Sequence, residues 1–459
     1  MMKLAKQGRP TSKIITAAAA AAVLAGVTAC GSGSGSGTAS GGATTGHVTL
    51  VVQNGDGGET GLLAGYAKLN KEFEAAHPGV TIDFVTKNFT DLVDTLKLQL
   101  SGSNPPDVTQ VNEGYSSMGE LVTDGLLTNL DSYASKYGWA SRQSAALLAV
   151  DGRFSANGQT MGTGPLWGVA ATGAWVGLFE NTKVAKSIGI TSAPTTFAEF
   201  EQDLAIAKKH GVVPLQYGSS DGGESAWMLA TLIADENTPQ TLLNIVDARP
   251  GASMTSPAIL KVADTIKTWA DDGYFTPGWA AYSNSDVFTK FTDGQGLFDL
   301  NGSWYVPISG SAASDIEMIP FPAVSGASGL AAVATGDVAW TIPAKSAHAT
   351  LAAEYINFIT SQAAGDTWIA SGNVPASMPD NASSELAAAH VTGASAEAVT
   401  DWQEIMTKGT ALPYVDWSTP TFYNTIESAT EELAGGKISP SAYVAKLQAD
   451  YGTFTKTRG

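Results

Sequence analysis

The sequence predicts an α/β fold built around a parallel sheet. Apolar residues alternate over Val48–Val52 and again over Val80–Phe84, as they do in strands. Between these runs, Leu62 to Phe73 place apolar residues on one helical face, and His77-Pro78-Gly79 ends that helix. A strand–helix–strand order of this kind implies parallel strands with helices covering the sheet.

The same alternation continues along the chain. Leu92, Leu96 and Leu100 mark a helix after Thr90, and Val108–Val111 is a third short strand. The β-α-β-α-β order therefore extends to about residue 111.

A second α/β region follows. The apolar, β-branched stretch from Gly168 to Phe179 is typical of buried strand, and Thr196 with Glu199 forms a capping box that opens a helix. Gly211 ends this helix, and Val212–Tyr217 is the next expected strand. A chain of 459 residues has room for two domains of ordinary size.

The C-terminal part is expected to be helical. Leu351 to Ile359 and Phe422 to Leu433 carry apolar residues at helical spacing. Ser439-Pro440 is the expected start of a last helix through Val444 to Tyr451, with serine at the cap and proline at the first helical position.

The N-terminus indicates export and lipidation. Lys3, Lys6, Arg9 and Lys13 precede an apolar stretch, Ile14–Ala29, which is typical of a signal peptide over residues 1–29. That stretch ends in Val27-Thr28-Ala29-Cys30, which resembles a lipobox, and Cys30 is the single cysteine of the chain. A Gly/Ser-rich flexible linker over 30–47 follows. We expect an extracytoplasmic protein, lipid-anchored to a bacterial cell membrane of the Gram-positive type.

Composition excludes several classes of function. The formal net charge of −18 argues against a nucleic-acid partner, which needs a basic surface. A single cysteine excludes disulfides within the chain, and the five histidines have no spacing that suggests a metal site. No cofactor is expected, and we expect a monomer.

Six segments in a fixed order resemble the family 1 extracellular solute-binding proteins, a maltose-binding-protein-like group of ABC importer receptors. They begin with Phe73-Glu74-Ala75-Ala76-His77-Pro78-Gly79-Val80-Thr81-Ile82 and Pro106-Asp107-Val108, and continue with Pro194-Thr195-Thr196-Phe197 and Asn301-Gly302-Ser303-Trp304, then Ile342-Pro343-Ala344-Lys345-Ser346 and Gly372-Asn373-Val374-Pro375-Ala376. Phe197 and Phe298 depart from the family's usual Trp and Met, but both remain apolar.

The resemblance implies a two-lobed, periplasmic-binding-protein-like fold of type II. It assigns residues 48–169 and 338–372 to lobe 1, and residues 170–337 and 373–459 to lobe 2. These discontinuous lobes would be joined by hinge strands, with a ligand cleft between them that closes on the solute. The implied partners are the ABC permease subunits in the membrane.

The residues favour a sugar as the solute, because sugars are bound by flat aromatic faces and by carboxylates or amides. Trp304 is the leading stacking candidate, since it occupies the family's ligand-facing tryptophan position. The other aromatic candidates are Trp175, Trp227, Trp340, Trp417, Phe422 and Tyr423. Core packing or bracing of the hinge is the competing explanation for several of them.

Polar candidates follow the predicted strands, at the edge where open α/β sheets bind ligands. They are Asp56, Glu59, Asn112 and Glu113, with Asn88, Asp221, Glu224 and Asp337 as weaker candidates. Solvated loop acids are the competing explanation. The absence of arginine among them argues against a phosphate or carboxylate ligand, so a neutral sugar or oligosaccharide is predicted.

Two other functions remain open. Acid-lined aromatic sites also bind amines, so a polyamine or an oligopeptide is an alternative solute. Gly218-Ser219-Ser220-Asp221-Gly222 matches G-x-S-x-G, which would make Ser220 a hydrolase nucleophile with His348 or His390 as its base. The binding-protein interpretation predicts no enzymatic activity.

Overall fold

A computed structural model describes residues 46–236, 238–308, 310–322 and 330–457. The predicted signal peptide, Cys30 and the linker up to residue 45 lie outside the described residues.

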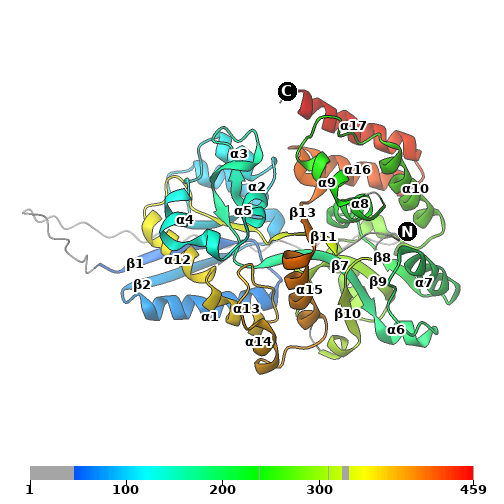
Figure 1. The fold of residues 1–459 in the computed structure, drawn as a ribbon, viewed down its shortest axis with the longest axis horizontal. Helices are drawn as coiled ribbons and strands as arrows, with labels where there is room; N and C mark the ends of the chain where they lie inside the picture. The colour runs from blue at the N-terminus through cyan, green and yellow to red at the C-terminus, as the bar shows by residue number, and fades with distance from the viewer. Residues whose placement is uncertain (1–45, 237, 309, 323–329, 458–459) are drawn as a thin grey trace, which may run out of the picture. The chain divides into compact units, whose positions relative to one another are not determined.

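The first sheet contains five strands in the order β2-β1-β3-β12-β6 (Figure 1). β1 pairs in parallel with β2 and β3, which confirms the predicted parallel arrangement, whereas β12 pairs antiparallel with β3 and β6. The strands are β1 (Val48–Asn54), β2 (Val80–Thr86), β3 (Val108–Val111), β6 (Gly168–Val169) and β12 (Ala339–Thr341).

The elements on and around this sheet come from two stretches of chain. They are α1 (Thr60–Ala76), α2 (Phe89–Ser101), α3 (Met118–Thr123), α4 (Asp131–Tyr137), η1 (Trp139–Ser141), α5 (Ala145–Gly152), the hairpin β4 (Arg153–Phe154) and β5 (Met161–Leu166), α12 (Ala349–Ile359) and α13 (Gln362–Ala370). α14 (Ala382–Ala388) follows α13, and its buried residues belong to the apolar cluster that contains Trp175 and Trp402.

The second sheet has the order β13-β11-β7-β9-β8, with β10 paired to β7. Its strands are β7 (Gly173–Asn181), β8 (Val213–Gln216), β9 (Gly296–Gly302), β10 (Ile316–Ile319), β11 (Ala331–Gly336) and β13 (Thr410–Leu412). β8 and β9 are parallel, so both end at the same edge of the sheet.

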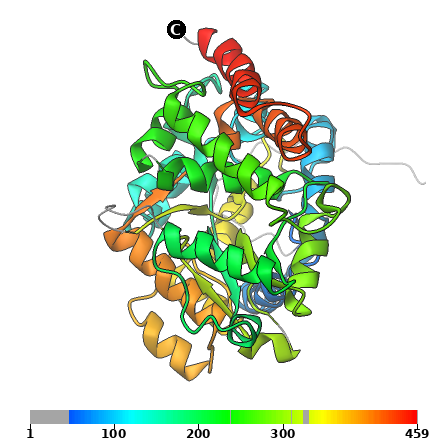
Figure 2. The same cartoon turned by 90° about the vertical axis from the view of Figure 1, so that its right-hand side faces the viewer.

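Many helices accompany the second sheet, and Figure 2 shows the C-terminal pair α16 and α17 beside the helices from the middle of the chain. The helical elements are α6 (Thr182–Ser187), α7 (Phe197–Lys209), α8 (Gly223–Glu236), α9 (Pro239–Val246), α10 (Pro257–Asp271), η2 (Trp279–Ala281), α11 (Asn284–Thr292), η3 (Ser303–Tyr305), η4 (Gly310–Ser314), α15 (Ala394–Lys408), η5 (Val415–Ser418), α16 (Phe422–Ala434) and α17 (Pro440–Lys456).

Helix boundaries follow the expected capping signals. Thr196 and Glu199 form the predicted capping box of α7, and the Ser439 side chain accepts a hydrogen bond from Ala442 N at the start of α17. α2 begins at Phe89 rather than after Thr90, because the Asn88 side chain accepts a hydrogen bond from Asp91 N and so caps the helix earlier.

Both sheets pack against buried apolar residues, and one apolar cluster contains residues of both lobes, among them Leu96 and Phe298. On the first sheet, Leu62, Tyr66, Leu69 and Phe73 form the buried face of α1, as their spacing predicts. The Tyr66 ring lies edge-on to Trp368, with 4.7 Å between ring centroids. The second sheet is packed against clusters that include Phe200, Phe298 and Trp269.

The chain passes between the sheets where β6 leads to β7, where β11 leads to β12, and after α13. The first and third of these crossings lie side by side, because Gly173 N donates to Val374 O (2.8 Å) and Ala376 N donates to Ala171 O (3.1 Å). The five-stranded sheet uses strands only from the ranges predicted for lobe 1, and the six-stranded sheet only from those predicted for lobe 2. The exact lobe boundaries stay a prediction.

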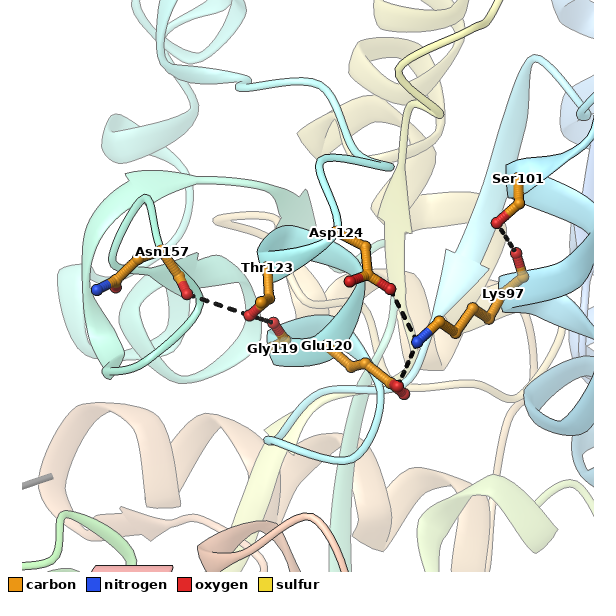
Figure 3. A network of polar contacts seen from close by, with 7 residues as sticks. All are labelled: Lys97, Ser101, Gly119, Glu120, Thr123, Asp124 and Asn157. Atoms are coloured by element: carbon orange, nitrogen blue, oxygen red, sulfur yellow. Dashed lines mark hydrogen bonds and ion pairs between the residues drawn. The ribbon is translucent and has the colours of Figure 1, made fainter. Parts of the chain in front are cut away.

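The surface of lobe 1 carries a local ion-pair network (Figure 3). Lys97 Nζ lies 2.5 Å from Glu120 Oε1 and 2.8 Å from Asp124 Oδ2, and it thereby connects α2 to α3. Thr123 Oγ1 donates to Asn157 O (3.1 Å), which joins α3 to the turn between β4 and β5. Within the described ranges, no helix is both long and apolar enough to cross a membrane.

Candidate functional site

The first group of candidates lies at the carboxyl ends of β1 and β3. Asp56 is 3% exposed, and its Oδ2 accepts a hydrogen bond from Gln110 Nε2 (3.1 Å). Gln110 also accepts from Gly55 N (2.7 Å) through its Oε1, so a β3 side chain fixes the loop after β1. Glu59 is half-exposed at the start of α1, and its N donates to Asp56 O (3.0 Å).

The surroundings of Asp56 and Glu59 disfavour the ionised form of both carboxyls. Burial raises the pKa of Asp56 well above its ordinary value, and the charge of Asp337 raises it further. Desolvation likewise raises the pKa of Glu59, with added contributions from Asp56 and Asp337. Asp337 therefore belongs to the same group, although it lies between β11 and β12, far away in sequence.

Glu113 follows β3, as predicted, but its side chain turns toward the crossing between the sheets. It is 2% exposed, and its Oε1 accepts a hydrogen bond from Ala339 N (2.9 Å). Its neighbour Asn112 is half-exposed, and its backbone carbonyl accepts from Met118 N.

The second group lies in lobe 2, at the carboxyl end of β8. Glu224, 3% exposed, accepts hydrogen bonds from Gly218 N (2.5 Å) and Asn284 Nδ2 (2.6 Å). Asp221 is exposed and accepts from Asn284 N at 3.0 and 3.2 Å through its two carboxyl oxygens. The Tyr423 hydroxyl donates to Asp221 O, which brings α16 to the same loop.

Aromatic residues stand beside this second group. Trp304 in η3 and Trp227 in α8 are half-buried, and their rings lie 5.0 Å apart at 65°. Trp304 folds back over Gly302, where a Cβ would lie 1.9 Å from its ring. The half-exposed face of Trp304 is consistent with the predicted stacking role, which stays a prediction.

Tyr305 lies within electrostatic range of carboxyls from both lobes. Burial raises the pKa of its phenol, and the charges of Glu59 from lobe 1 and of Asp299, Asp221 and Glu224 from lobe 2 raise it further. That Glu59 and the carboxyls of lobe 2 line one site stays a prediction.

Several aromatic candidates lie in the core. Trp175 and Trp340 are fully buried; the Trp175 indole N–H donates to Ala398 O (3.0 Å) and that of Trp340 to Tyr66 Oη (3.2 Å). Phe422 is also fully buried, near Tyr451. Their packing accounts for their presence without a ligand.

Trp417 and Asn88 have other structural positions. Trp417 is 3% exposed, and a Cβ at Gly114 would lie 2.8 Å from its Cγ, so it packs directly on lobe 1 backbone. Asn88 is exposed and its side chain caps α2.

The structure adds residues that sequence reasoning missed. Asp151 in α5 and Asp299 in β9 are both fully buried, and Tyr414 and Asp416 flank the start of η5. Burial raises the pKa of Asp299 to about 8 and that of Asp416 to about 7. Tyr305 could have been found from its place beside Trp304, whereas Asp151 gives only one signal, an acid that ends an apolar helix.

The site resembles no metal centre. Among the residues that the structure describes, no group of His, Cys, Asp and Glu has the arrangement needed to hold a metal ion.

Comparison with known proteins identifies the family. The profile described as "Bacterial extracellular solute-binding protein" matches residues 56–366. The chain belongs to this family. The resemblance seen in the sequence motifs is thereby confirmed.

Relatives of this solute-binding protein are distant in sequence. A "Multiple sugar-binding protein" of Streptococcus mutans is 23% identical over 64% of this chain and 67% of the relative. A "Putative binding protein" of Brucella abortus is 23% identical over 50% of this chain, and that match covers about half of the relative, 52%.

Solved structures confirm the predicted fold. A "Chitin oligosaccharide binding protein" superposes with a TM-score of 0.74 at 21% identity, covering 89% of this chain and 99% of the other. The bacterial solute receptor AcbH, described as having an exclusive preference for β-D-galactopyranose, gives 0.73 at 16% identity, covering 89% and 100%. This solute-binding protein therefore has the two-lobed fold of type II periplasmic binding proteins, with sheets in both lobes.

Proposed function

We propose that this protein is the extracytoplasmic substrate-binding lipoprotein of an ABC importer, which captures a neutral sugar or oligosaccharide by hinge closure and delivers it to the membrane permease. It performs no chemical reaction on the solute. The observation that carries the proposal is the half-exposed ring of Trp304, 5.0 Å from the ring of Trp227 and next to Tyr305, whose phenol is within electrostatic range of carboxyls from both lobes.

The chemistry of this group suits hydroxyl-rich ligands. Carboxyls accept hydrogen bonds from sugar hydroxyls when ionised, and they also donate when protonated. Burial and mutual repulsion raise the pKa of Asp56, Glu59 and Glu224, which favours the protonated form. The relatives named for sugars support the same class of ligand.

A polyamine is the second candidate, because one observation favours it. The charges of Asp56 and Asp337 raise the pKa of Glu59, and those of Asp299 and Asp221 raise the pKa of Glu224, so a ligand with amino groups would meet closely spaced acidic side chains. An anionic ligand is disfavoured for the same reason.

A thermal-shift array of sugars and polyamines on the purified protein separates the two candidates. A ligand that binds only the folded state raises the unfolding midpoint. We expect at least one mono- or oligosaccharide to raise it and spermidine to leave it unchanged. Stabilisation by polyamines alone would reject the sugar.

A serine hydrolase has little structural support. Ser220 does lie in a turn between β8 and α8, as a nucleophile elbow would. The candidate base His348, however, lies with its Nδ1 3.1 Å from Asp107 Oδ1 in lobe 1, and His390 is exposed just after α14. Stoichiometric labelling of Ser220 by a serine-reactive phosphonate would overturn the non-enzymatic proposal.

The lipid anchor at Cys30 can be tested separately. Expression of the full chain and of Cys30→Ser in a bacterium that processes lipoproteins, followed by membrane fractionation, should place the first in the membrane and release the second. Equal membrane association of both proteins would contradict anchoring through Cys30.

A further inference from the structure

The crossing segment between β11 and β12 is held by carboxyl groups. Each backbone N–H from residue 336 to residue 339 donates a hydrogen bond, and three of the four acceptors are carboxyl oxygens. The bonds run from Gly336 N to Asp151 Oδ1 (2.8 Å), from Asp337 N to Thr172 O (2.8 Å), from Val338 N to Asp337 Oδ1 (2.9 Å) and from Ala339 N to Glu113 Oε1 (2.9 Å).

One of these carboxyls connects this crossing to the first, and an amide side chain connects the first crossing to the third. Asp337 Oδ2 accepts a hydrogen bond from Thr172 Oγ1 (3.1 Å), and Thr172 lies in the first crossing. Gln143, just before α5, donates from Nε2 to Ala170 O (2.7 Å) and to Ser377 Oγ (3.3 Å), which joins the first crossing to the third. We call Asp151, Asp337 and Glu113 the hinge carboxyls. They bind the segments that connect the lobes, so a rotation of one lobe against the other would change their contacts.

The environment of the hinge carboxyls is unfavourable for negative charge. Asp151 is fully buried, its Oδ2 has no hydrogen-bond partner, and a Cβ at Gly336 would lie 2.3 Å from that oxygen. A buried carboxylate oxygen without a donor is costly, whereas the neutral acid avoids most of that cost.

Several acidic and phenolic groups influence the charge of these carboxyls or are influenced by it. The electrostatic neighbours of Asp337 are Asp56 and Glu59 after β1, Tyr66 on α1, Glu113 after β3, Asp151 in α5 and Tyr414 before η5. The nearby Arg153 is directed away, to Asp131 Oδ1 (3.4 Å) and Gly164 O (2.7 Å). Burial is the main cause that raises the pKa of all three hinge carboxyls. The charge of Asp337 adds to it for Asp151 and Glu113, whereas backbone hydrogen bonds oppose it in all three carboxyls.

We propose that Asp151, Asp337 and Glu113 are positioning residues for lobe closure, and that the protein takes up protons when its lobes close. The structure has the lobes in contact, since the rings of Tyr115 in lobe 1 and Phe454 in lobe 2 lie 5.0 Å apart. Opening would hydrate the hinge carboxyls and let them ionise, so a lower pH favours the closed arrangement. The proposal rests on the proposed function, in which the lobes close to capture a solute. Its test, however, measures closure in the absence of a solute.

Spin labels can report closure directly. Ser116 and Lys456 are exposed and lie next to Tyr115 and within two residues of Phe454, so labels at these positions lie at the contact between the lobes. The full chain carrying Cys30→Ser, Ser116→Cys and Lys456→Cys would be measured by pulsed electron resonance from about pH 9 to about pH 5.

We expect the ratio of short to long label distances to rise as the pH falls, by up to about tenfold per pH unit for each proton taken up. Asp337→Asn keeps an oxygen acceptor for Val338 N but cannot ionise. It should therefore raise the short-distance population at high pH and flatten the pH response. Glu113→Gln serves in the same way if the first variant does not fold.

The matched control is Asp124→Asn, which removes a carboxyl of lobe 1 from an exposed ion pair with Lys97 (Figure 3). It should keep the wild-type pH response. A distance distribution that does not change with pH in the folded protein, or an Asp337→Asn variant that responds as wild type, would overturn the proposal. If the protein does not capture a solute at all, no solute in the thermal-shift array would stabilise it. That result would reject the proposed function and is distinct from the outcomes above.

Discussion

The two lobes contribute different chemistry to the candidate site. Lobe 1 supplies carboxyls, Asp56 and Glu59, held by the loop after β1 and by Gln110. Lobe 2 supplies aromatic rings as well, with Trp304 and Trp227 beside Glu224. A ligand bound between them would meet hydrogen-bonding groups from both lobes and flat apolar faces from lobe 2, which is the combination that sugars need.

The largest expected effect comes from the comparison between the buried Trp175 and the half-exposed Trp304. Trp175→Ala removes a fully buried indole, so it should lower the free energy of unfolding by about 3–5 kcal/mol. Urea denaturation followed by circular dichroism measures this loss. A Trp175→Ala protein with wild-type stability and abolished sugar binding would instead place this residue in the site.

Trp304→Ala should act on binding rather than on folding. With the sugar that gives the largest thermal shift, we expect calorimetry to show affinity weakened more than tenfold, about 1.4 kcal/mol or more. Phe197→Ala is a matched control, because Phe197 is also half-buried in lobe 2 but packs near Trp269 and Phe321. Unchanged affinity in Trp304→Ala would remove this tryptophan from the site.

Asp416 gives the next expected effect, a dependence of the free energy of unfolding on pH. Burial raises its pKa to about 7, so the folded state holds a proton that the unfolded state releases near its lower pKa. Its contribution to stability is therefore fully present below the unfolded-state pKa of 3.8 and is lost progressively as the pH rises from there through about 7. The loss amounts to at most about 1.4 kcal/mol per pH unit in that window.

Denaturation of wild type and Asp416→Asn across this pH range tests the assignment. The variant should lose less stability than wild type as the pH rises. Parallel pH profiles for the two proteins would show that Asp416 titrates normally in the folded state.

The surface ion pairs of lobe 1 give the smallest expected effect. Lys97→Ala breaks the contacts with Glu120 and Asp124, yet all three side chains are more than a third exposed. Solvent screens such pairs, so the urea midpoint of unfolding should fall only slightly. A fall in the midpoint as large as that of Trp175→Ala would mean that this network, unlike an ordinary surface pair, stabilises the lobe.

The sequence by itself determined the β1-α1-β2-α2-β3 order at the start of the first lobe, the capping box at Thr196 and the start of α17 at Pro440. These features depend on local periodicity and on short-range hydrogen bonds, and both are determined by residues close together in the sequence. The ordered motifs also indicated the family correctly.

The tertiary structure decided which side chains meet. Trp175, Trp340 and Phe422 look like Trp304 in sequence, but long-range packing buries them in the cores, and only the fold distinguishes the two cases. Asp151 and Asp337 are separated by α5 to β11 in the chain, yet they act on the same crossing segment, because the chain passes between the lobes more than once. Contacts between residues so far apart in sequence depend on the path of the chain in three dimensions. Local sequence patterns do not predict that path.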